Sequence, residues 1–377
     1  MTSEDRREAR YRRRRLKREE KRQSALAKYG QYDKVFSFGN LYRAYKGARR
    51  NVGWKPSTKR FVAFAPGNVW KLYDELQRGV YKSDGFTEFD IHERGKARHI
   101  RAVKISERIV QKCLNRFCLT PLLSRSFIYD NGASLPGKGQ CFTMERIKQK
   151  LRRHIRRCGP EGWTLTFDFK GYFDNLDHGV IFAILDRAIA DERLRERCKY
   201  FVRCFGERGL GLGSEISQAL ALAAASSIDH LFCDRLGLPY VRYMDDGLAI
   251  STDRGKLQEA ETLLRRTCER LRIRINPGKT VIRPLRDGFR FMKIRTRPQR
   301  SGKITQRLPE NNLRLARTRI GKLRAYLDRG CISLADIWQS FQSWRSYALR
   351  FRAYRHIQDM KEFLIRVYPG IMQRRTA

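Results

Sequence analysis

Acidic residues are scarce in this sequence: 39 Asp and Glu stand against 81 Lys and Arg, a formal net charge of +42 over 377 residues. Such an excess of one sign makes a compact chain repel itself, and a phosphate backbone is the usual partner that relieves the repulsion. Hydrophobic residues still make up 41% of the chain, enough for a packed core. The composition therefore favours nucleic-acid binding over a structural protein of the ribosomal type and over a solvated basic surface without a single ligand. It does not separate an enzyme from a passive binder.

The cysteines lack the spacing of a metal site. There are nine, none of them in a CxxC pair, and His154, which lies near Cys158, has no second ligand pair to complete a zinc site. An odd, dispersed set is typical of reduced thiols in a cytosolic protein. We therefore expect a cytoplasmic protein without a structural zinc ion.

Long apolar runs are lacking as well. The N-terminus is charged and has no apolar segment of the kind found in a secretory signal. No run comes near the ~18 apolar residues that a membrane-spanning helix needs. The stretch 219–228 is apolar but short, so we expect a buried helix there and no membrane partner.

A basic segment opens the chain. Residues 1 to about 30 are highly charged and include Arg12, Arg13, Arg14 and Arg15 in a row. Such a segment is either a solvated helix or disordered arm, or an arm that contacts the phosphates of RNA.

Strand-like patterns occur at four places. Residues 86–91 alternate between apolar and polar, and Gly95 marks a turn before a second run at 98–103. Residues 163–169 are typical of a buried strand. A hairpin is predicted from the strand-like residues 240–243 and 248–250, with a turn at 244–247. A closing pair of strands is predicted at 289–295 and 303–308. Beyond these, Leu313, Ile320, Leu323 and Leu327 mark one face of a helix.

Three aspartates fall at the ends of these strands. Asp168 ends the buried strand, and Asp245 and Asp246 lie at the hairpin tip. Phosphoryl transfer to a primer needs two divalent cations, and Mg²⁺ prefers oxygen ligands such as carboxylates. An Asp in a turn or at a strand end is ordinarily only local turn chemistry. The three together, in this order and in so basic a chain, predict a two-metal site.

The motifs around these aspartates resemble those of reverse transcriptases. Tyr243-Met244-Asp245-Asp246 resembles their Tyr-x-Asp-Asp box, and residues 167–177 resemble their first catalytic motif in its bacterial retroelement form. The resemblance runs from about residue 40 to about residue 355. Residues 95–100 and 108–111 resemble the fingers motifs of the family, and residues 209–218 resemble its template-contacting loop. Further matches are the lysine motif at 276–280, the primer grip at 288–292 and the thumb at 343–347.

The resemblance implies an α+β fold of the right-hand polymerase type, with fingers, a palm and a short helical thumb. The palm is expected to be an antiparallel sheet backed by helices. The implied regions are a basic arm at 1–35, fingers at 36–160, a palm at 161–302 and a thumb at 303–377. No RNase H, endonuclease or zinc-finger signature follows.

The resemblance also implies roles for individual residues. The catalytic and metal-binding set is Asp168, Asp245 and Asp246 with the backbone carbonyl of Phe169, holding two Mg²⁺ ions, with Mn²⁺ as an alternative. Phe173 stands where the family has its steric gate, an aromatic ring that leaves no room for a ribose 2′-hydroxyl. The other substrate-binding candidates are Lys96, Arg98, Leu212, Gly213, Gln218 and Lys279, and the primer-grip candidates are Phe291 and Met292.

Two positions depart from the family pattern. The usual Pro-Gln-Gly is Gly211-Leu212-Gly213 here, and Leu212 replaces a polar residue, so we hypothesise relaxed base discrimination. The usual glycine of the primer grip is Lys293. The segment from Gly213 to Gln218 has the form typical of diversity-generating retroelement enzymes, a form related to that of some bacterial defence enzymes.

We therefore predict an RNA-directed DNA polymerase of a compact bacterial retroelement, error-prone and serving diversity generation. Its expected partners are an RNA template, a DNA or RNA primer and deoxynucleotides, with a structured non-coding RNA and a small accessory protein as further candidates. The alternative role is anti-phage defence, including untemplated or protein-primed DNA synthesis. A non-catalytic RNA-binding protein is disfavoured by the intact aspartates and by Phe173.

Overall fold

The computed structural model describes residues 3–93, 96–299, 301–309 and 311–371, and it divides the chain into two compact units. The first unit consists of Met1–Thr143, Phe167–Ala249 and Gln258–Thr280. The second consists of Met144–Thr166, Ile250–Leu257 and Val281–Ala377. This division follows contacts in space, so it does not test the four regions predicted along the sequence, and those stay a prediction.

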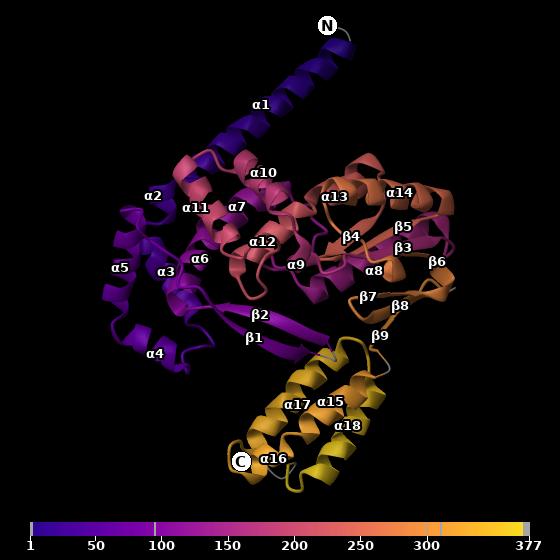
Figure 1. Ribbon diagram of the computed structural model, residues 1–377. Coiled ribbons are helices and arrows are strands. Elements are labelled where there is room, and N and C mark those ends of the chain that lie inside the picture. Colours follow the sequence, from indigo (N-terminus) through magenta and orange to yellow (C-terminus); the bar gives the residue numbers. More distant parts are fainter. Residues whose placement is uncertain (1–2, 94–95, 300, 310, 372–377) are drawn as a thin grey trace. The chain divides into compact units, whose positions relative to one another are not determined.

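The basic N-terminal segment is one long helix, α1 (Ser3–Tyr29). Its described side chains are exposed almost throughout, and Ala25, near its end, is the first that is buried. Figure 1 shows α1 leading out from the other helices of the first unit. The segment is therefore a solvated helix, one of the forms expected from its charge.

The helices that follow form an apolar core within the first unit. The buried side chains include Phe36, Leu41, Val69 and Ile109. Leu41, Val69 and Ile109 lie on helices with apolar residues at helical spacing, as expected for faces that pack together, and Phe36 directly follows α2. These elements are α2 (Tyr32–Val35), α3 (Phe38–Ala48), α4 (Pro56–Ala63), α5 (Ala65–Gln77), α6 (Ile105–Leu114), a π-helical turn at Asn115–Leu119, α7 (Thr120–Leu123) and a 3-10 turn at Ser124–Ser126.

The predicted strands at 86–91 and 98–103 form an antiparallel hairpin. The strands are β1 (Phe86–Glu93) and β2 (Lys96–Val103), with Phe86 opposite Val103 and Phe89 opposite Ile100. Each is longer than the sequence pattern indicated, because the pairing extends toward the turn beyond the alternating residues. Gly95 itself lies outside the described residues.

A four-stranded sheet carries the aspartates, in the order β4-β5-β3-β6. The strands are β3 (Trp163–Asp168), β4 (Tyr240–Tyr243), β5 (Asp246–Ser251) and β6 (Val281–Pro284). β4 pairs with β5 in antiparallel register, and so does β3 with β6. Strand β3 is divided between the two units, with Trp163–Thr166 in the second and the last two residues in the first.

Helices connect these strands. They are α8 (Gln140–Cys158), α9 (Tyr172–Asn175), α10 (His178–Ala188), α11 (Glu192–Arg203), α12 (Glu215–Ala224), α13 (Ser226–His230), a π-helical turn at Leu231–Arg235, α14 (Arg254–Arg270) and 3-10 turns at Pro277–Lys279 and Leu285–Asp287. Antiparallel sheets with helices confirm the predicted α+β class.

The apolar stretch 219–228 lies within the helical segment Glu215–Arg235, which comprises α12, α13 and the π-helical turn that follows. By length and composition alone, residues Glu215–Arg235 could cross a membrane. This differs from the expectation that no run comes near the length of a membrane-spanning helix. Of the 18-residue window that meets this criterion, 78% is buried inside the protein, as in a core helix. This burial agrees with the buried helix that the sequence predicts.

The second unit ends in a small sheet and a set of helices. The sheet has three strands, β7 (Phe289–Phe291), β8 (Ile294–Pro298) and β9 (Ile304–Arg307), where the sequence predicted only a pair. The helices are α15 (Asn312–Gly321), α16 (Arg324–Asp328), α17 (Leu334–Leu349) and α18 (Tyr354–Val367). The predicted single helix face breaks between α15 and α16, and only Ile320 of its four residues is buried.

Candidate active site

Strand β3 places Asp168 at its end. Leu165 and Phe167 are buried and lie on one face of the strand, so Asp168 falls on the other face. The ring of Phe167 stacks against Phe232 at 5.6 Å and against Tyr240 at 6.2 Å between ring centres. This aromatic stack fixes the strand end, and with it the backbone that carries Asp168.

Two side chains from the 276–279 segment bind the Asp168 carboxylate. Asn276 Nδ2 donates to one carboxylate oxygen at 3.2 Å, and Lys279 Nζ donates to the other at 2.6 Å. The backbone N–H of Asn276 also donates to the carbonyl of Asp168 at 2.8 Å. Asn276 belongs to the lysine motif but was not predicted as a site residue, and only the fold brings it to Asp168.

The hairpin β4–β5 presents the other two aspartates. Tyr243 pairs with Asp246, so the turn consists of Met244 and Asp245, and Asp246 is the first residue of β5 rather than part of the turn. Met244 has a φ of 54°, and a positive φ at this position is the sign pattern of a type II′ turn, which favours glycine.

Two contacts fix this hairpin against β3. The backbone N–H of Phe169 donates to the carbonyl of Asp245 at 3.2 Å. A Cβ atom on Gly247 would lie 2.1 Å from the ring of Phe167, so only glycine fits directly after the two aspartates. The register of the aspartates is therefore set by backbone pairing on one side and close packing on the other.

Asp168, Asp245 and Asp246 lie close enough to influence one another's charge. Burial, together with the negative charges of Asp245 and Asp168, raises the pKa of Asp246 to about 7 against the opposing effect of Lys279. Burial acts against the charge of Lys279, but its hydrogen bond to Asp168 and the three carboxylates outweigh this and raise the pKa of Lys279. Three carboxylates beside one ammonium group leave an excess of negative charge.

The donor chemistry of this site fits a divalent cation. Carboxylate oxygens are the ligands that Mg²⁺ and Mn²⁺ prefer, and the charges of Asp245 and Asp168 add to the effect of burial in raising the pKa of Asp246. Among the described residues, no group of three or more His, Cys, Asp and Glu side chains has the spacing of a metal site. Since both Asp168 oxygens are engaged by Asn276 and Lys279, metal ligation by this set, and by the Phe169 carbonyl, stays a prediction.

Phe173, the predicted steric gate, lies on α9 beside this cluster in sequence. Its side chain is half-buried, and its ring makes an edge contact with Tyr172 at 5.9 Å between centres. The hydroxyl of Tyr172 donates to the carbonyl of Ala221 on α12 at 2.6 Å. The short helix is thereby fixed to the core while Phe173 keeps part of its surface open.

The glycine-rich loop is bound directly to the segment that carries Phe173. The N–H of Leu210 donates to the carbonyl of Phe173 at 2.8 Å, and the N–H of Gly209 donates to that of Leu176 at 2.8 Å. A Cβ on Gly209 would lie 2.6 Å from the carbonyl oxygen of Asp174, so the close approach requires glycine there. The glycine-rich loop and the segment that carries Phe173 are therefore joined by backbone hydrogen bonds, although they belong to two separate sequence motifs.

Leu212 and Gly213 lie at the tip of this loop. Leu212 is half-buried, and Gly213 is exposed with a φ of 106°. Behind them, the hydroxyl of Ser214 donates to Gln111 at 2.6 Å, and Gln111 donates to the buried Glu107 at 2.8 Å. Neither Glu107 nor Gln111 was predicted as a site residue. The sequence pattern that could have pointed to them is a pair of polar residues four positions apart among the apolar residues of α6.

Gln218 is exposed on α12. It lines a cavity of about 330 Å³ together with Lys112 and Glu215, which form an ion pair. The lining includes none of the described side chains of Asp168, Asp245, Asp246 and Phe173. The structure therefore offers Gln218 a binding space of its own.

The remaining predicted residues are not placed against this cluster. Lys96 and Arg98 belong to β2, but their side chains lie outside the described part of the structure. Phe291 is buried in β7 and Met292 is half-buried in the turn that follows, and both belong to the second unit. Their roles toward a triphosphate and a primer stay predictions.

Comparisons with known proteins bear on the whole arrangement. A family model described as reverse transcriptase (RNA-dependent DNA polymerase) matches residues 82–295, more than half of the chain. No curated protein matches. The match covers β1 and β2, the aspartate cluster, the glycine-rich loop and the start of the three-stranded sheet.

The solved structures that resemble this chain include two telomerases. One is telomerase from Candida albicans in complex with a TWJ fragment of telomeric RNA, with 14% identity, a TM-score of 0.46, and coverage of 83% of this chain and 64% of that chain. The other is apo telomerase from Candida tropicalis truncated from its C-terminal domain, with 13% identity, a TM-score of 0.45, and coverage of 59% and 54%. The chain therefore spans less than two thirds of either protein.

Proposed function

Since the chain belongs to the reverse transcriptase (RNA-dependent DNA polymerase) family, we propose that it extends a primer with deoxynucleotides on an RNA template, as the polymerase of a compact bacterial retroelement. Family membership confirms the predicted fold and the predicted enzyme class, an RNA-directed DNA polymerase. The observation that carries the proposal is the convergence of Asp168, Asp245 and Asp246 from two strands at one place.

The proposed reaction uses the aspartates to hold two divalent ions, Mg²⁺ or Mn²⁺, with the Phe169 carbonyl as a further ligand. When bound, the ions would lower the pKa of the primer 3′-hydroxyl and balance charge on the transferred phosphate. We assign the protonation of the pyrophosphate leaving group to Lys279, whose ammonium group lies 2.6 Å from the Asp168 carboxylate and whose pKa is raised. Phe173, half-buried on α9, would close the space for a ribose 2′-hydroxyl.

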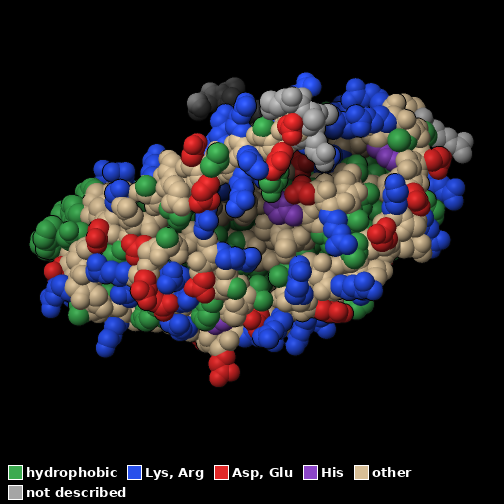
Figure 2. Space-filling view, turned by 90° about the horizontal axis from the view of Figure 1, so that it is seen from above, with side chains coloured by type: hydrophobic (Ala, Val, Ile, Leu, Met, Phe, Trp, Pro, Cys, Tyr) green, Lys and Arg blue, Asp and Glu red, His purple; other side chains and the backbone are tan. Residues whose placement is uncertain are grey.

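The surface chemistry supports a nucleic-acid partner. The net charge is +42, and Figure 2 shows Lys and Arg side chains spread over the visible face with fewer Asp and Glu between them. RNA template and primer are the partners this charge fits. A structured non-coding RNA, a small accessory protein, a cytoplasmic location and the absence of a membrane partner complete the proposal.

Primer extension by the purified full chain tests the activity. With Mg²⁺ or Mn²⁺, deoxynucleotides and an annealed primer, we expect products that copy an RNA template to its end. Phe173→Ala should admit ribonucleotides about 100-fold more readily while leaving deoxynucleotide incorporation nearly unchanged. Failure of the parent chain to extend any primer on any template would contradict the proposed activity.

The retroelement role rests on the segment from Gly213 to Gln218 and on Leu212, and we propose error-prone synthesis for diversity generation. Sequencing the products of the parent and of Leu212→Gln tests this, because a restored polar side chain should lower misincorporation. Equal error rates in the two proteins would contradict the hypothesis. Products without template sequence, or covalently attached to protein, would instead favour the defence alternative with untemplated or protein-primed synthesis.

A further inference from the structure

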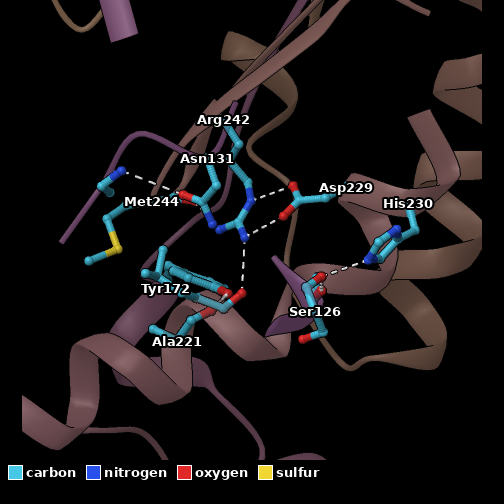
Figure 3. Close-up of polar contacts among 11 residues, drawn as sticks. Ser126, Asn131, Tyr172, Ala221, Asp229, His230, Arg242 and Met244 are labelled. Atoms are coloured by element: carbon cyan, nitrogen blue, oxygen red, sulfur yellow. Dashed lines mark hydrogen bonds and ion pairs between the residues drawn. The ribbon is translucent and has the colours of Figure 1, made fainter. Parts of the chain in front are cut away.

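A buried arginine stands directly before the catalytic turn. Arg242 is the third residue of β4, two positions before Met244, and its side chain is fully buried. Its guanidinium binds both oxygens of Asp229, at 2.6 Å and 2.7 Å. It also donates to the carbonyl of Met244 at 2.9 Å and to that of Leu222 at 2.9 Å, and Figure 3 shows the guanidinium facing the Asp229 carboxylate.

The contact with Met244 acts on the turn that carries Asp245. Met244 has a left-handed backbone conformation that favours glycine, so this turn needs outside contacts to hold it. Arg242 holds the carbonyl of Met244, and the N–H of Phe169 holds the carbonyl of Asp245. Both carbonyls of the two-residue turn are therefore fixed by donors from outside it.

The same guanidinium joins the turn to two helices. Leu222 lies in α12 and Asp229 in α13, so one side chain links the turn to both. The backbone of Arg242 is held as well, because its N–H donates to Asp130 and its carbonyl accepts from Gly132 at 2.9 Å. A planar guanidinium with several fixed donors suits this task, which a lysine cannot perform.

Stability does not account for such a pair. Burying two charges costs desolvation that their attraction repays only in part, and apolar replacements of equal volume are often as stable. What an apolar pair cannot supply is the directed bond to the Met244 carbonyl. We propose that Arg242, locked by Asp229, is a positioning residue that sets the catalytic turn and so the placement of Asp245 and Asp246. This inference rests on the proposed polymerase function.

The test removes both charges together, so that no unpaired charge stays buried. The variant is Arg242→Met with Asp229→Leu, compared with Arg242→Lys and with Leu185→Ala, a cavity-forming change in the buried face of α10. Three quantities are measured for each purified full chain: the melting temperature, kcat and KM in primer extension, and the rate of amide hydrogen exchange in the peptide covering residues 240–251.

We expect the double variant to melt near the parent temperature, to lower kcat by about 10- to 100-fold, and to keep KM for deoxynucleotide within about twofold. Exchange at 240–251 should become faster. The kcat of Arg242→Lys should lie between that of the double variant and that of the parent. Leu185→Ala should lower the melting temperature while keeping the parent's kcat and its exchange at 240–251.

A folded double variant with parental kcat and parental exchange would overturn the proposal, and so would an equal drop of kcat in Leu185→Ala. If the double variant does not fold, the same comparison is made with Arg242→Lys, and parental kcat and exchange there overturn the proposal too. A parent chain that extends no primer contradicts the proposed function alone, since hydrogen exchange at 240–251 still tests the positioning.

Discussion

Two hairpins of this protein use similar turns for opposite purposes. In β4–β5 the turn residue Met244 has a φ of 54°, and in β7–β8 the turn residues Met292 and Lys293 have φ values of 49° and 67°. The first hairpin is buried along nearly its whole length and carries acids at its tip. The second alternates buried and exposed residues, so it has one open face. One hairpin fixes charges in place, and the other presents a surface.

The open face of the second hairpin is basic in a regular way. Arg290 lies opposite Arg295, and Arg295 lies opposite Arg307, so three exposed arginines form a row across the three strands. Like charges directly opposite one another on a sheet destabilise it. A chain that keeps such a row is expected to gain from an anionic partner, and the phosphates of a nucleic acid provide one.

The largest expected effect comes from the acidic tip. Asp245→Asn with Asp246→Asn removes the charges that would hold the metal ions, so we expect primer extension to fall by more than about 1,000-fold. RNA affinity, measured by filter binding at fixed salt, should stay within about twofold of the parent, because these acids do not contact phosphate directly. Extension within tenfold of the parent would show that the site lies elsewhere.

Substitutions in the basic row should weaken binding of nucleic acid and leave catalysis unchanged, the reverse of substitutions at the acidic tip. Replacing Arg290, Arg295 and Arg307 by Gln should weaken binding of a template–primer by about tenfold or more. The slope of log affinity against log salt should fall by about 0.9 for each phosphate that the arginines no longer neutralise. At saturating template, kcat should be unchanged.

The matched control for the basic row removes the same charge from exposed positions of α14, by Gln at Lys256, Arg266 and Arg270. Both variants are measured by filter binding over the same range of salt concentration. Equal weakening by the control would mean that only the net charge of the protein matters, and the row itself would have no special role.

Packing around the acidic hairpin should be intolerant of one methyl group. Gly247→Ala places a Cβ 2.1 Å from the Phe167 ring, so we expect a drop of about 1–3 kcal/mol in the free energy of unfolding. The measurement is chemical denaturation. Adding Phe167→Leu, which removes the ring, should recover part of that drop; no recovery would place the strain elsewhere.

The smallest effect is expected in the basic hairpin. Lys293→Gly removes the cost of a left-handed lysine, and we expect a gain of about 1 kcal/mol in the free energy of unfolding. Lys303→Gly, in the neighbouring loop and without a positive φ, should give no gain. Both are measured by chemical denaturation. A gain of the same size at both positions would show that the turn conformation is not the cause.

Local patterns predicted much of the fold. The strand ending at Asp168 and the hairpin around Asp245 were placed to within one or two residues, because apolar alternation and turn residues are short-range signals. The third strand of the small sheet was missed, since Met292 and Lys293 lack the Asn-Gly or Gly signal of a tight turn. The break between α15 and α16 was missed although Gly321 ends α15, because the apolar spacing of Leu313, Ile320, Leu323 and Leu327 continues across it.

The sequence by itself determined the chemistry of this protein: the three aspartates, their order, and the excess of positive charge. Those are properties of residue type and local spacing. Only the tertiary structure decided what holds the acids. Asn276 and Lys279 reach Asp168 across 108 and 111 positions of the chain, and Arg242, which holds the Met244 carbonyl, is itself bound to Leu222 and Asp229 on two helices. Such contacts depend on how distant elements pack, and no local pattern encodes them.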